Sequence, residues 1–352
     1  MNLNEIRATI DRIDSEILKL LNDRMEQALL AKRFKSSIED LDREKAIMEK
    51  LKKSPQSLLD SELKENIYKL IISRSKELQA RDCKIIGFQG EHGAYSEDAA
   101  RKWDNDLIAI PCTTFNDVFE GVNSCWFDFG IVPVENTFGG IVGPVNELLT
   151  NVEVFVAGAV DMQVSHNLLA LPGTDYREIK EVYSHTQALA QCRGFIARNK
   201  LTPVPFYDTA GAAKMLAETK PRGTACIAGT LAAELYNLDI IKDSIQDFSN
   251  NRTRFLVLAK EKQESKGTKC SAAFSAQHKP GALFNVLRVF ADAGINLTRM
   301  ESIPIEPGNY SFLIDFEGND NDPVIKDALN KVTEVTTNFK LLGCYIEKVI
   351  SN

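Results

Sequence analysis

The first part of the chain repeats hydrophobic residues at alternating spacings of four and three positions. The stripe consists of Ile6, Ile10, Ile13, Ile17 and Leu20, and it resumes with Ala31, Phe34 and Ile38. This spacing predicts one face of a long helix that packs against another helix. Two polar residues, Arg24 and Gln27, occupy the positions in between, where the stripe requires hydrophobic residues.

Arg24 is the residue on this stripe that needs an explanation. A guanidinium keeps its charge, and a buried charge without a partner costs on the order of several kcal/mol. Either a protein carboxylate or a bound anion must therefore pair with Arg24. The stripe alone does not decide between the two.

Residues 1 to about 81 show helical periodicity throughout and contain no glycine. The predicted elements are a helix to about Ser37, a second from Asp40 to Lys52, and a third from after Asp60 to Gln79. One long and two short helices cannot enclose a core, so the long helix needs a partner, most simply the same helix of a second copy. The pattern therefore predicts an all-α domain in a homodimer or higher homo-oligomer.

The pattern changes at Cys83. Short β-rich runs alternate with helical stretches over 83–262, which predicts an α/β domain with two lobes and a cleft between them. A polar linker at 261–268 follows. Residues 268–352 then follow the order strand, helix, strand, strand, helix, strand, which is the α+β ferredoxin-like arrangement. Pro280 and Gly294 mark the two ends of its first helix.

Composition narrows the range of partners. The net charge of −7 argues against nucleic acid. No stretch approaches the roughly 20 apolar residues of a membrane span, and the N-terminus does not resemble a signal peptide. The seven cysteines are scattered without a CxxC motif, which predicts reduced thiols in a cytoplasmic protein. The four histidines are also scattered, which argues against a histidine-based metal site.

Several charged and polar residues of the helical region are candidates for one pocket. Arg24 and Lys35 are eleven residues apart, which leaves them about 20° apart on the helix surface. Arg7 lies roughly 100° around the helix from Arg24 and suits a pocket of the partner helix better. The further candidates, at helical spacings, are Asp40, Arg43, Glu44, Ser75 and Gln79. A charged bundle with solvated faces would explain any of these residues except Arg24.

Taken together, these residues resemble the all-helical chorismate mutases over residues 1 to about 80. The resemblance implies rearrangement of chorismate to prephenate, a pericyclic reaction that needs no cofactor and depends on fixed cations and amide donors. It also implies the following roles: Arg7 of the partner subunit, Arg24 and Arg43 bind carboxylates, Lys35 and Gln79 contact the ether oxygen, Asp40 and Glu44 lie near the ring hydroxyl, and Ser75 supports a carboxylate.

Three motifs, GIVPVENTFGG, YSHTQALAQC and NNRTRFLVLAK, occur in this order in the middle region. They resemble prephenate dehydratase from about residue 83 to 262, which implies cofactor-free loss of carbon dioxide and hydroxide from prephenate. The resemblance makes Thr253 the hydroxyl donor. Arg254 would be the carboxylate partner. The neutral donors would be Asn136, Thr137, Ser184 and Gln187.

His185 is a general acid by residue type, although a lone histidine in a loop is more often structural. Gly87, Gly90 and Gly93 do not have the spacing of a nucleotide-binding loop. We expect them to form a tight turn from strand to helix that lines the cleft. The amides at that helix start could face a carboxylate.

The last region resembles an ACT domain, a small regulatory module that binds amino acids. Phenylalanine-sensing members carry the motifs GAL and ESRP, which appear here as Gly281, Ala282 and Leu283, and as Glu301 and Ser302 followed by Ile303 in place of arginine. The resemblance implies L-phenylalanine as allosteric effector. A structural dimerisation domain without a ligand is the alternative.

The three resemblances together imply a bifunctional chorismate mutase/prephenate dehydratase under feedback inhibition by phenylalanine. Two alternatives remain at this point. One is a dehydratase that prefers arogenate and carries a vestigial mutase. The other is a sensor that binds a ligand without turnover.

Overall fold

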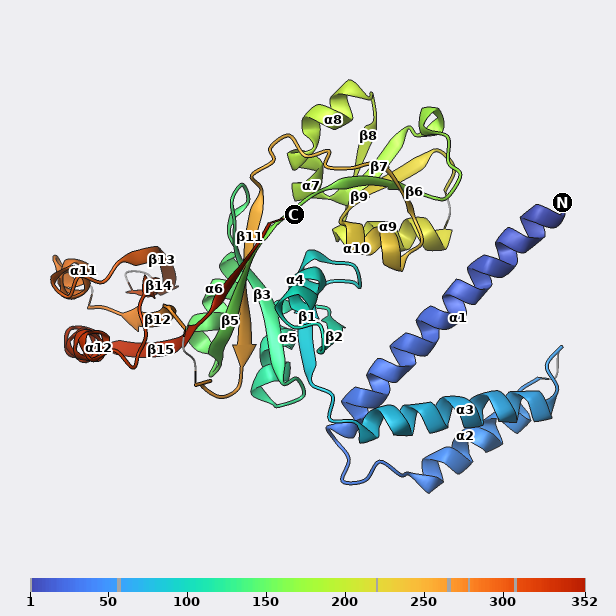
Figure 1. Ribbon diagram of the computed structural model, residues 1–352, viewed down its shortest axis with the longest axis horizontal. Helices are drawn as coiled ribbons and strands as arrows, with labels where there is room; N and C mark the ends of the chain where they lie inside the picture. Colours follow the sequence, from blue (N-terminus) through green and yellow to red (C-terminus); the bar gives the residue numbers. More distant parts are fainter. Residues whose placement is uncertain are drawn as a thin grey trace. The chain divides into compact units, whose positions relative to one another are not determined.

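The computed structural model describes residues 2–55, 58–219, 221–264, 267–277, 279–306 and 309–351. The chain forms two compact units, Met1–Lys84 and Ile85–Asn352, which are described separately (Figure 1). No helix in these described ranges is long and apolar enough to cross a membrane. Of the polar linker predicted at 261–268, residues 265 and 266 lie outside the described residues.

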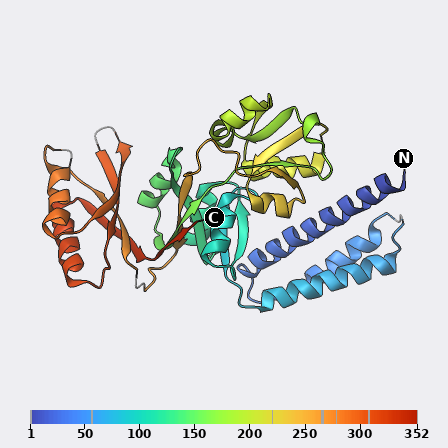
Figure 2. The ribbon, with the colours of Figure 1, turned by 45° about the horizontal axis from the view of Figure 1, so that its top comes forward.

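The first unit is all-helical, as predicted. Its helices are α1 (Leu3–Lys32), α2 (Leu41–Lys53) and α3 (Ser61–Ala80) (Figures 1 and 2). Asp40 and Asp60 cap α2 and α3, because their side chains accept hydrogen bonds from the backbone N–H groups of Arg43 and Leu63.

Helix α1 ends at Lys32, about five residues before the predicted end near Ser37. The backbone N–H groups of Arg33, Phe34 and Lys35 donate to carbonyls three residues earlier, so the last turn tightens and the helix stops. Lys35 therefore lies beyond the helix. The prediction that Lys35 and Arg24 share a helical face is wrong.

The second unit begins with a mixed sheet that forms the first lobe (Figure 1). Its strands, in the order in which they pair, are β16 (Glu347–Ile350), β5 (Phe155–Gln163), β11 (Arg252–Ala259), β3 (Phe129–Asn136), β1 (Ile85–Gln89) and β2 (Ile108–Cys112), with β4 (Gly140–Ile141) paired to β3. Its helices are α4 (Tyr95–Trp103), α5 (Phe115–Asn123) and α6 (Gly143–Asn151).

The second lobe has its own five-stranded sheet. The strands, in pairing order, are β10 (Asp239–Lys242), β6 (Asn167–Ala170), β9 (Thr224–Ala228), β7 (Glu181–His185) and β8 (Thr202–Phe206). The helices are η1 (Tyr176–Glu178), α7 (Thr186–Gln191), α8 (Arg193–Arg198), α9 (Thr209–Thr219) and α10 (Thr230–Leu235). The chain enters this lobe after β5 and returns through β11, which confirms the predicted two-lobed α/β architecture.

The loop between β1 and α4, which contains Gly90 and Gly93, is a packed turn as expected, whereas Gly87 lies within β1 and none of the three glycines lines the cavity between the lobes. Gly93 has φ 88°, and a Cβ there would lie 2.8 Å from the backbone of Ala232. A Cβ on Gly87 would lie 2.4 Å from the ring of Phe127. These two glycines thus allow close packing.

The third sheet, in the order β13-β14-β12-β15, confirms the predicted ferredoxin-like arrangement. Its elements along the chain are β12 (Lys269–Ser275), α11 (Ala282–Asp292), β13 (Leu297–Glu306), β14 (Asn309–Glu317), α12 (Pro323–Val335) and β15 (Asn338–Tyr345). Both helices share a hydrophobic core with the sheet, which includes Val286, Phe290 and Val332. Gly294, with φ 67°, follows the end of α11 as predicted.

The last strand predicted in residues 268–352 divides in two. β15 belongs to the ferredoxin-like sheet, whereas β16 pairs in parallel with β5 of the first lobe. The chain passes close to β5 at Gly343, where a Cβ would lie 2.3 Å from the carbonyl oxygen of Val156. The Arg252 guanidinium donates to the carbonyl oxygen of Ile350 at 3.1 Å. The last strand is thus part of the first lobe.

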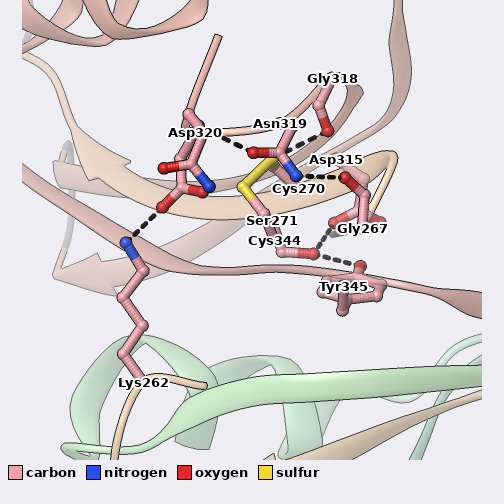
Figure 3. The surroundings of a disulfide bond; sticks show 11 residues. Lys262, Gly267, Cys270, Ser271, Asp315, Gly318, Asn319, Asp320, Cys344 and Tyr345 are labelled. Carbon is pink, nitrogen blue, oxygen red and sulfur yellow. Dashed lines mark hydrogen bonds and ion pairs between the residues drawn. A yellow bond between two sulfur atoms is a disulfide. The ribbon is translucent and has the colours of Figure 1, made fainter. Parts of the chain in front are cut away.

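Two of the seven cysteines form a disulfide, which corrects the prediction that the thiols are reduced. Cys270 on β12 and Cys344 on β15 face each other across the antiparallel pair, with Cα atoms 4.0 Å apart (Figure 3). They are separated by 74 residues in the sequence, and only the strand register brings them together. The other five cysteines are free.

We expect the chain, denatured without reductant, to expose five reactive thiols, and seven after reduction. Thiol titration of the denatured protein measures this number. Cys344→Ser is the control, because it removes the bond and should give the same number with and without reductant. Seven thiols without reductant in the unmodified chain would contradict the bond.

Candidate active sites

Arg24 is partly buried in the helical unit. Its Nη1 atom is buried and has no hydrogen-bond partner among the described residues. The same holds for Oε1 of Gln79 on α3. A buried cationic donor and a buried amide oxygen left open in this way are typical of a ligand pocket.

Ser75 and Gln79 form a pair, as their spacing predicts. Both residues are buried, and Nε2 of Gln79 donates to the carbonyl oxygen and to Oγ of Ser75, each at 3.1 Å. The pair therefore holds the Gln79 amide in place.

The charged candidates around α2 form separate pairs. Nζ of Lys35 lies 3.7 Å from Oδ2 of Asp40, and Oε1 of Glu44 lies 2.7 Å from Nζ of Lys76. Sequence reasoning missed Lys76, although it stands next to Ser75. A hydrogen bond with Glu44 raises the pKa of Lys76.

Arg43 and Arg7 are exposed. Arg7 stands 17 residues before Arg24 on the same helix, which corresponds to about 25 Å along its axis. One copy of the chain therefore cannot bring both guanidinium groups to one small ligand.

A cavity of about 560 Å³ lies between the two lobes of the second unit. Of the residues predicted for this site, Asn136, His185, Gln187 and Thr253 line it. Thr253 and Asn136 come from β11 and β3 of the first lobe, and His185 and Gln187 come from the second lobe. The cavity thus collects polar side chains from both lobes.

Asn136 is the central residue of the cavity wall. Its Nδ2 donates to Oγ1 of Thr253 and to Oδ1 of Asn251, each at 2.8 Å. Its Oδ1 accepts from the backbone N–H of Gly139 at 2.7 Å and, at 3.4 Å, from Nε2 of Gln187. Because Oγ1 of Thr253 accepts the bond from Asn136, the hydroxyl keeps its own proton for donation to a ligand.

Gln191, Asn251 and His166 extend this network, and sequence reasoning missed all three. Oε1 of Gln191 accepts from Nδ2 of Asn251 at 3.0 Å and lies 2.6 Å from Nε2 of His166. Tyr95 Oη lies 2.7 Å from Nδ1 of the same histidine. Gln191 could have been found, because it stands four residues after Gln187 on one face of α7.

Three predicted residues do not line the cavity. Ser184 is fully buried, and its Oγ donates to the carbonyl oxygen of Ile227, so it ties β7 to β9. Oγ1 of Thr137 accepts from the backbone N–H of Arg252 at 3.1 Å and so fixes the ends of β3 and β11. Arg254 points away from the cavity, because it follows Thr253 on a strand where side chains alternate between faces.

The placement of Arg254 corrects the expectation that it holds a substrate carboxylate. Its guanidinium donates to Asp315 at 2.6 Å and to Tyr345 at 2.9 Å, and it is also paired with Glu347. These partners lie on β14, β15 and β16. No Arg or Lys is among the described residues that line the cavity.

Helix starts supply the positive potential that the cavity wall lacks in side chains. Tyr95 and Ser96 of α4, and Gly143 of α6, line the cavity. Neither helix start is capped by a side chain. The N–H groups of these first turns and the helix dipole favour an anion at this wall.

Asp208 is an acidic residue of the cavity wall that sequence reasoning missed. Burial raises its pKa, and hydrogen bonds from the backbone N–H groups at the start of α9 act in the opposite direction. It is the acidic side chain among the described residues that line the cavity. His185, on the same wall, accepts a hydrogen bond from the backbone N–H of Gln187 at 3.3 Å.

The residues predicted to bind an effector lie in the ferredoxin-like part. Gly281 is the N-cap of α11 with φ 84°, and Ala282 and Leu283 start that helix. Glu301 and Ser302 lie on the edge strand β13. Ile303, which stands in place of arginine, is buried.

Three family models match the chain in succession. They are chorismate mutase type II at residues 6–80, prephenate dehydratase at residues 86–263 and the ACT domain at residues 272–334.

Relatives that cover the whole chain or about three quarters of it agree with these matches. A bifunctional chorismate mutase/prephenate dehydratase from Aquifex aeolicus is 35% identical over 358 residues, with 97% of each chain covered. An arogenate dehydratase/prephenate dehydratase from Arabidopsis thaliana is 37% identical over 74% of this chain and 72% of its own. The solved structure of a prephenate dehydratase from Arthrobacter aurescens in complex with L-Phe superposes with a TM-score of 0.69 and 29% identity, over 74% of this chain and 89% of that one.

We expect His166 to make the stability of the second unit depend on pH. Burial lowers the pKa of His166 below that of an unfolded histidine, so the unfolded chain takes up a proton first as the pH falls. The stability that comes from the neutral histidine is present above about pH 6.5 and is lost below it. Chemical denaturation at a series of pH values should show a smaller loss towards acid for His166→Gln than for the unmodified chain. An equal loss in both proteins would contradict this account.

Proposed function

The chain belongs to the bifunctional chorismate mutase/prephenate dehydratase family, and on that premise we propose how its two sites divide the chemistry. It is an enzyme with a chorismate mutase domain, a prephenate dehydratase domain and an ACT domain. The alternative of a sensor without turnover is thereby set aside. We propose that the helical unit converts chorismate to prephenate and that the cavity between the lobes converts prephenate to phenylpyruvate.

The open guanidinium of Arg24 is the observation that carries the mutase assignment. Its Nη1 is buried without a partner, so a substrate carboxylate would satisfy a donor that the described protein does not. Gln79 and Lys35 would address the ether oxygen, where negative charge grows in the transition state. Nε2 of Gln79 donates to Ser75 in the structure, so to present Nε2 to the ether oxygen the amide would have to rotate by half a turn and give up its bond to the Ser75 carbonyl. Arg43 would contact a substrate carboxylate, and Ser75 would support that contact. Asp40 and Glu44 would lie near the ring hydroxyl.

The exposed apolar stripe of α1 and the place of Arg7 also support a homodimer. The apolar stripe on α1 is 40–58% exposed at Ile6, Ile10, Ile13, Ile17 and Leu20. A second copy of α1 would cover this stripe. It would also bring Arg7 of the partner subunit to the pocket that holds Arg24, which one copy cannot do.

The bond from Asn136 to Thr253 carries the dehydratase assignment. It leaves the Thr253 O–H free to donate a hydrogen bond to the leaving hydroxyl group of prephenate. Asn136, Gln187 and Gln191 would orient the substrate, and the starts of α4 and α6 would hold a carboxylate. The reaction turns one carboxylate into carbon dioxide. The described residues that line the cavity include no Arg or Lys, and this suits the step, because a fixed cation would stabilise the charge that has to disappear.

Arogenate is a second candidate substrate for the same cavity. It carries an ammonium group where prephenate has a ketone, and Asp208 on the cavity wall could pair with that group. The plant relative described above is named for both substrates. Turnover of the two substrates side by side distinguishes them.

We expect Arg24→Leu and Thr253→Ala to separate the two reactions. Arg24→Leu should lower chorismate turnover by about a hundredfold or more, because it removes a carboxylate partner. It should leave prephenate turnover intact and stabilise the helical unit, since a buried unpaired donor is gone. Thr253→Ala should lower only prephenate turnover, by about a hundredfold.

Steady-state rates with each substrate, and chemical denaturation, measure these effects. Arg12→Leu on the same helix is the matched control, because Arg12 is partly exposed and already paired with Glu16. Loss of both reactions in either folded variant would show that the two-site assignment is wrong. A less stable Arg24→Leu protein would indicate that Arg24 has a protein partner instead.

We also propose that L-phenylalanine binds the ACT domain and inhibits the dehydratase. The motif residues Gly281, Ala282, Leu283, Glu301 and Ser302 support this proposal, as does the solved relative in complex with L-Phe.

Prephenate turnover should fall by about fivefold or more at saturating L-phenylalanine, as expected for an allosteric coupling of ordinary size. Initial rates at a series of effector concentrations measure this. L-alanine, which lacks the ring, is the control. Unchanged rates at saturating L-phenylalanine would leave the ACT domain with a structural role.

A further inference from the structure

Strands β3 and β11 carry two pairs of polar residues on opposite faces. Their antiparallel register pairs Thr253 with Asn136 and Arg254 with Glu135. Successive side chains of a strand point to opposite faces of the sheet. Thr253 and Asn136 line the cavity, whereas Arg254 and Glu135 do not.

Residues of the ACT domain and of β16 bind Arg254 on the face of the sheet opposite the cavity. Its side chain is 7% exposed. Nη1 donates to Oδ2 of Asp315 at 2.6 Å, and Nη2 donates to Tyr345 Oη at 2.9 Å. Nε is paired with Glu347. Ser271 bonds both Asp315 and Tyr345, next to the disulfide (Figure 3).

Glu135 also contacts the ACT domain on this face of the sheet. Its Oε2 lies 3.3 Å from Nε of Arg299 on β13 of the ACT domain, which is an ion pair without the geometry of a hydrogen bond. Nη2 of Arg299 donates to Oδ1 of Asn146 on α6 at 3.0 Å. The charged residues of this back-face cluster are Arg254, Arg299, Lys269, Glu135, Asp315 and Glu347. The cations and the carboxylates are equal in number, so the charges of the cluster compensate one another.

The cavity-lining pair of Thr253 and Asn136 needs these contacts on the opposite face, because the hydrogen-bond ladder between β3 and β11 is irregular next to the pair. Arg254 pairs with Glu135 but Phe255 pairs with Pro133, so Val134 is an extra residue that forms a β-bulge. Pro133 has no N–H to donate to the ladder. The end of β3 that carries Asn136 is therefore separated from the regular part of this ladder, whereas Thr253 also pairs in register with Met162 of β5.

We propose that Arg254 and Glu135 are positioning residues of the dehydratase, through which the ACT domain holds Thr253 and Asn136 in place. The inference rests on the proposed function of the cavity. Thr253 has to lie within hydrogen-bond reach of the leaving group, and a displacement of about 1 Å can cost on the order of a hundredfold in rate. Asp315 thus acts on the reaction from another domain without touching the substrate.

Asp315→Asn in the whole chain tests the proposal. The substitution keeps the shape of the side chain and removes its charge. Prephenate kcat should fall by about tenfold or more, with KM changed by less than about threefold, because the group that is misplaced acts in the transition state. Chorismate turnover by the same polypeptide should not change. The matched control is Asp327→Asn, in an exposed pair with Lys331 on α12 of the same domain, and it should leave both reactions unchanged.

A second measurement separates positioning from a general loosening of the fold. In the Thr253→Ala background, Asp315→Asn should lower kcat little further, because the group that it positions is missing. If the fold losses in kcat of the two single variants multiply in the double variant, the effect of Asp315→Asn is structural and the proposal is overturned. Glu135→Gln is a further variant that should keep the fold, since Glu135 is 37% exposed, and its prephenate kcat should fall as well.

Other outcomes are also decisive. Wild-type kcat in both Asp315→Asn and Glu135→Gln would overturn the proposal. A rise in KM at unchanged kcat would do the same, because it would point to a role in substrate binding. If the unmodified chain does not convert prephenate, it is the proposed function that fails.

Discussion

The antiparallel pairing of β3 with β11 is the contact on which the larger unit depends. It joins a strand that precedes the second lobe in the chain to the strand on which the chain returns from that lobe. The period of two residues along each strand then assigns neighbouring residues to different tasks. Thr253 and Asn136 face the cavity, and Arg254 and Glu135 face the ACT domain. Cavity-lining groups and interdomain contacts are therefore one residue apart in the sequence but on opposite sides of the sheet.

Compensation of buried charge explains why two arginines of this chain behave differently. Burial alone would lower the pKa of Arg254, but the nearby Tyr345, Asp315 and Glu347 raise it. Arg24 has a buried Nη1 without a partner among the described residues. Breaking a closed buried pair costs roughly 3–5 kcal/mol, so Arg254 is committed to its structural partners. Of the two arginines, Arg24 is the one that is available to an anion.

Much of this architecture could be predicted from local sequence patterns, because helix and strand periods and turn residues act over short distances. The three helices, the two lobes and the βαββαβ order all followed from them. The motif with Thr253 and Arg254 suggests one site, although a predicted strand already implies that these neighbours face opposite sides. Strand alternation applied to the motif would have separated them. Other features depend on tertiary register: the pairing of Cys270 with Cys344 requires that of β12 and β15, and the return of β16 requires β5. Asn251 joins Asn136 across 115 residues of sequence, so its role comes from its partner and not from its own sequence context.

The two proposed sites solve different electrostatic problems with different groups. The mutase rearrangement leaves both carboxylates of its substrate intact, so a fixed cation such as Arg24 can bind substrate and transition state alike and hold the reacting ends together. The dehydratase reaction removes one of those charges as carbon dioxide. A fixed cation on that carboxylate would stabilise the substrate more than the transition state and slow the step. Neutral amides, a hydroxyl and helix starts can hold the substrate with weaker and more directional interactions. The guanidinium of Arg254 lies one residue from Thr253, yet the strand turns it to the back of the sheet, where its charge can support the site without entering it.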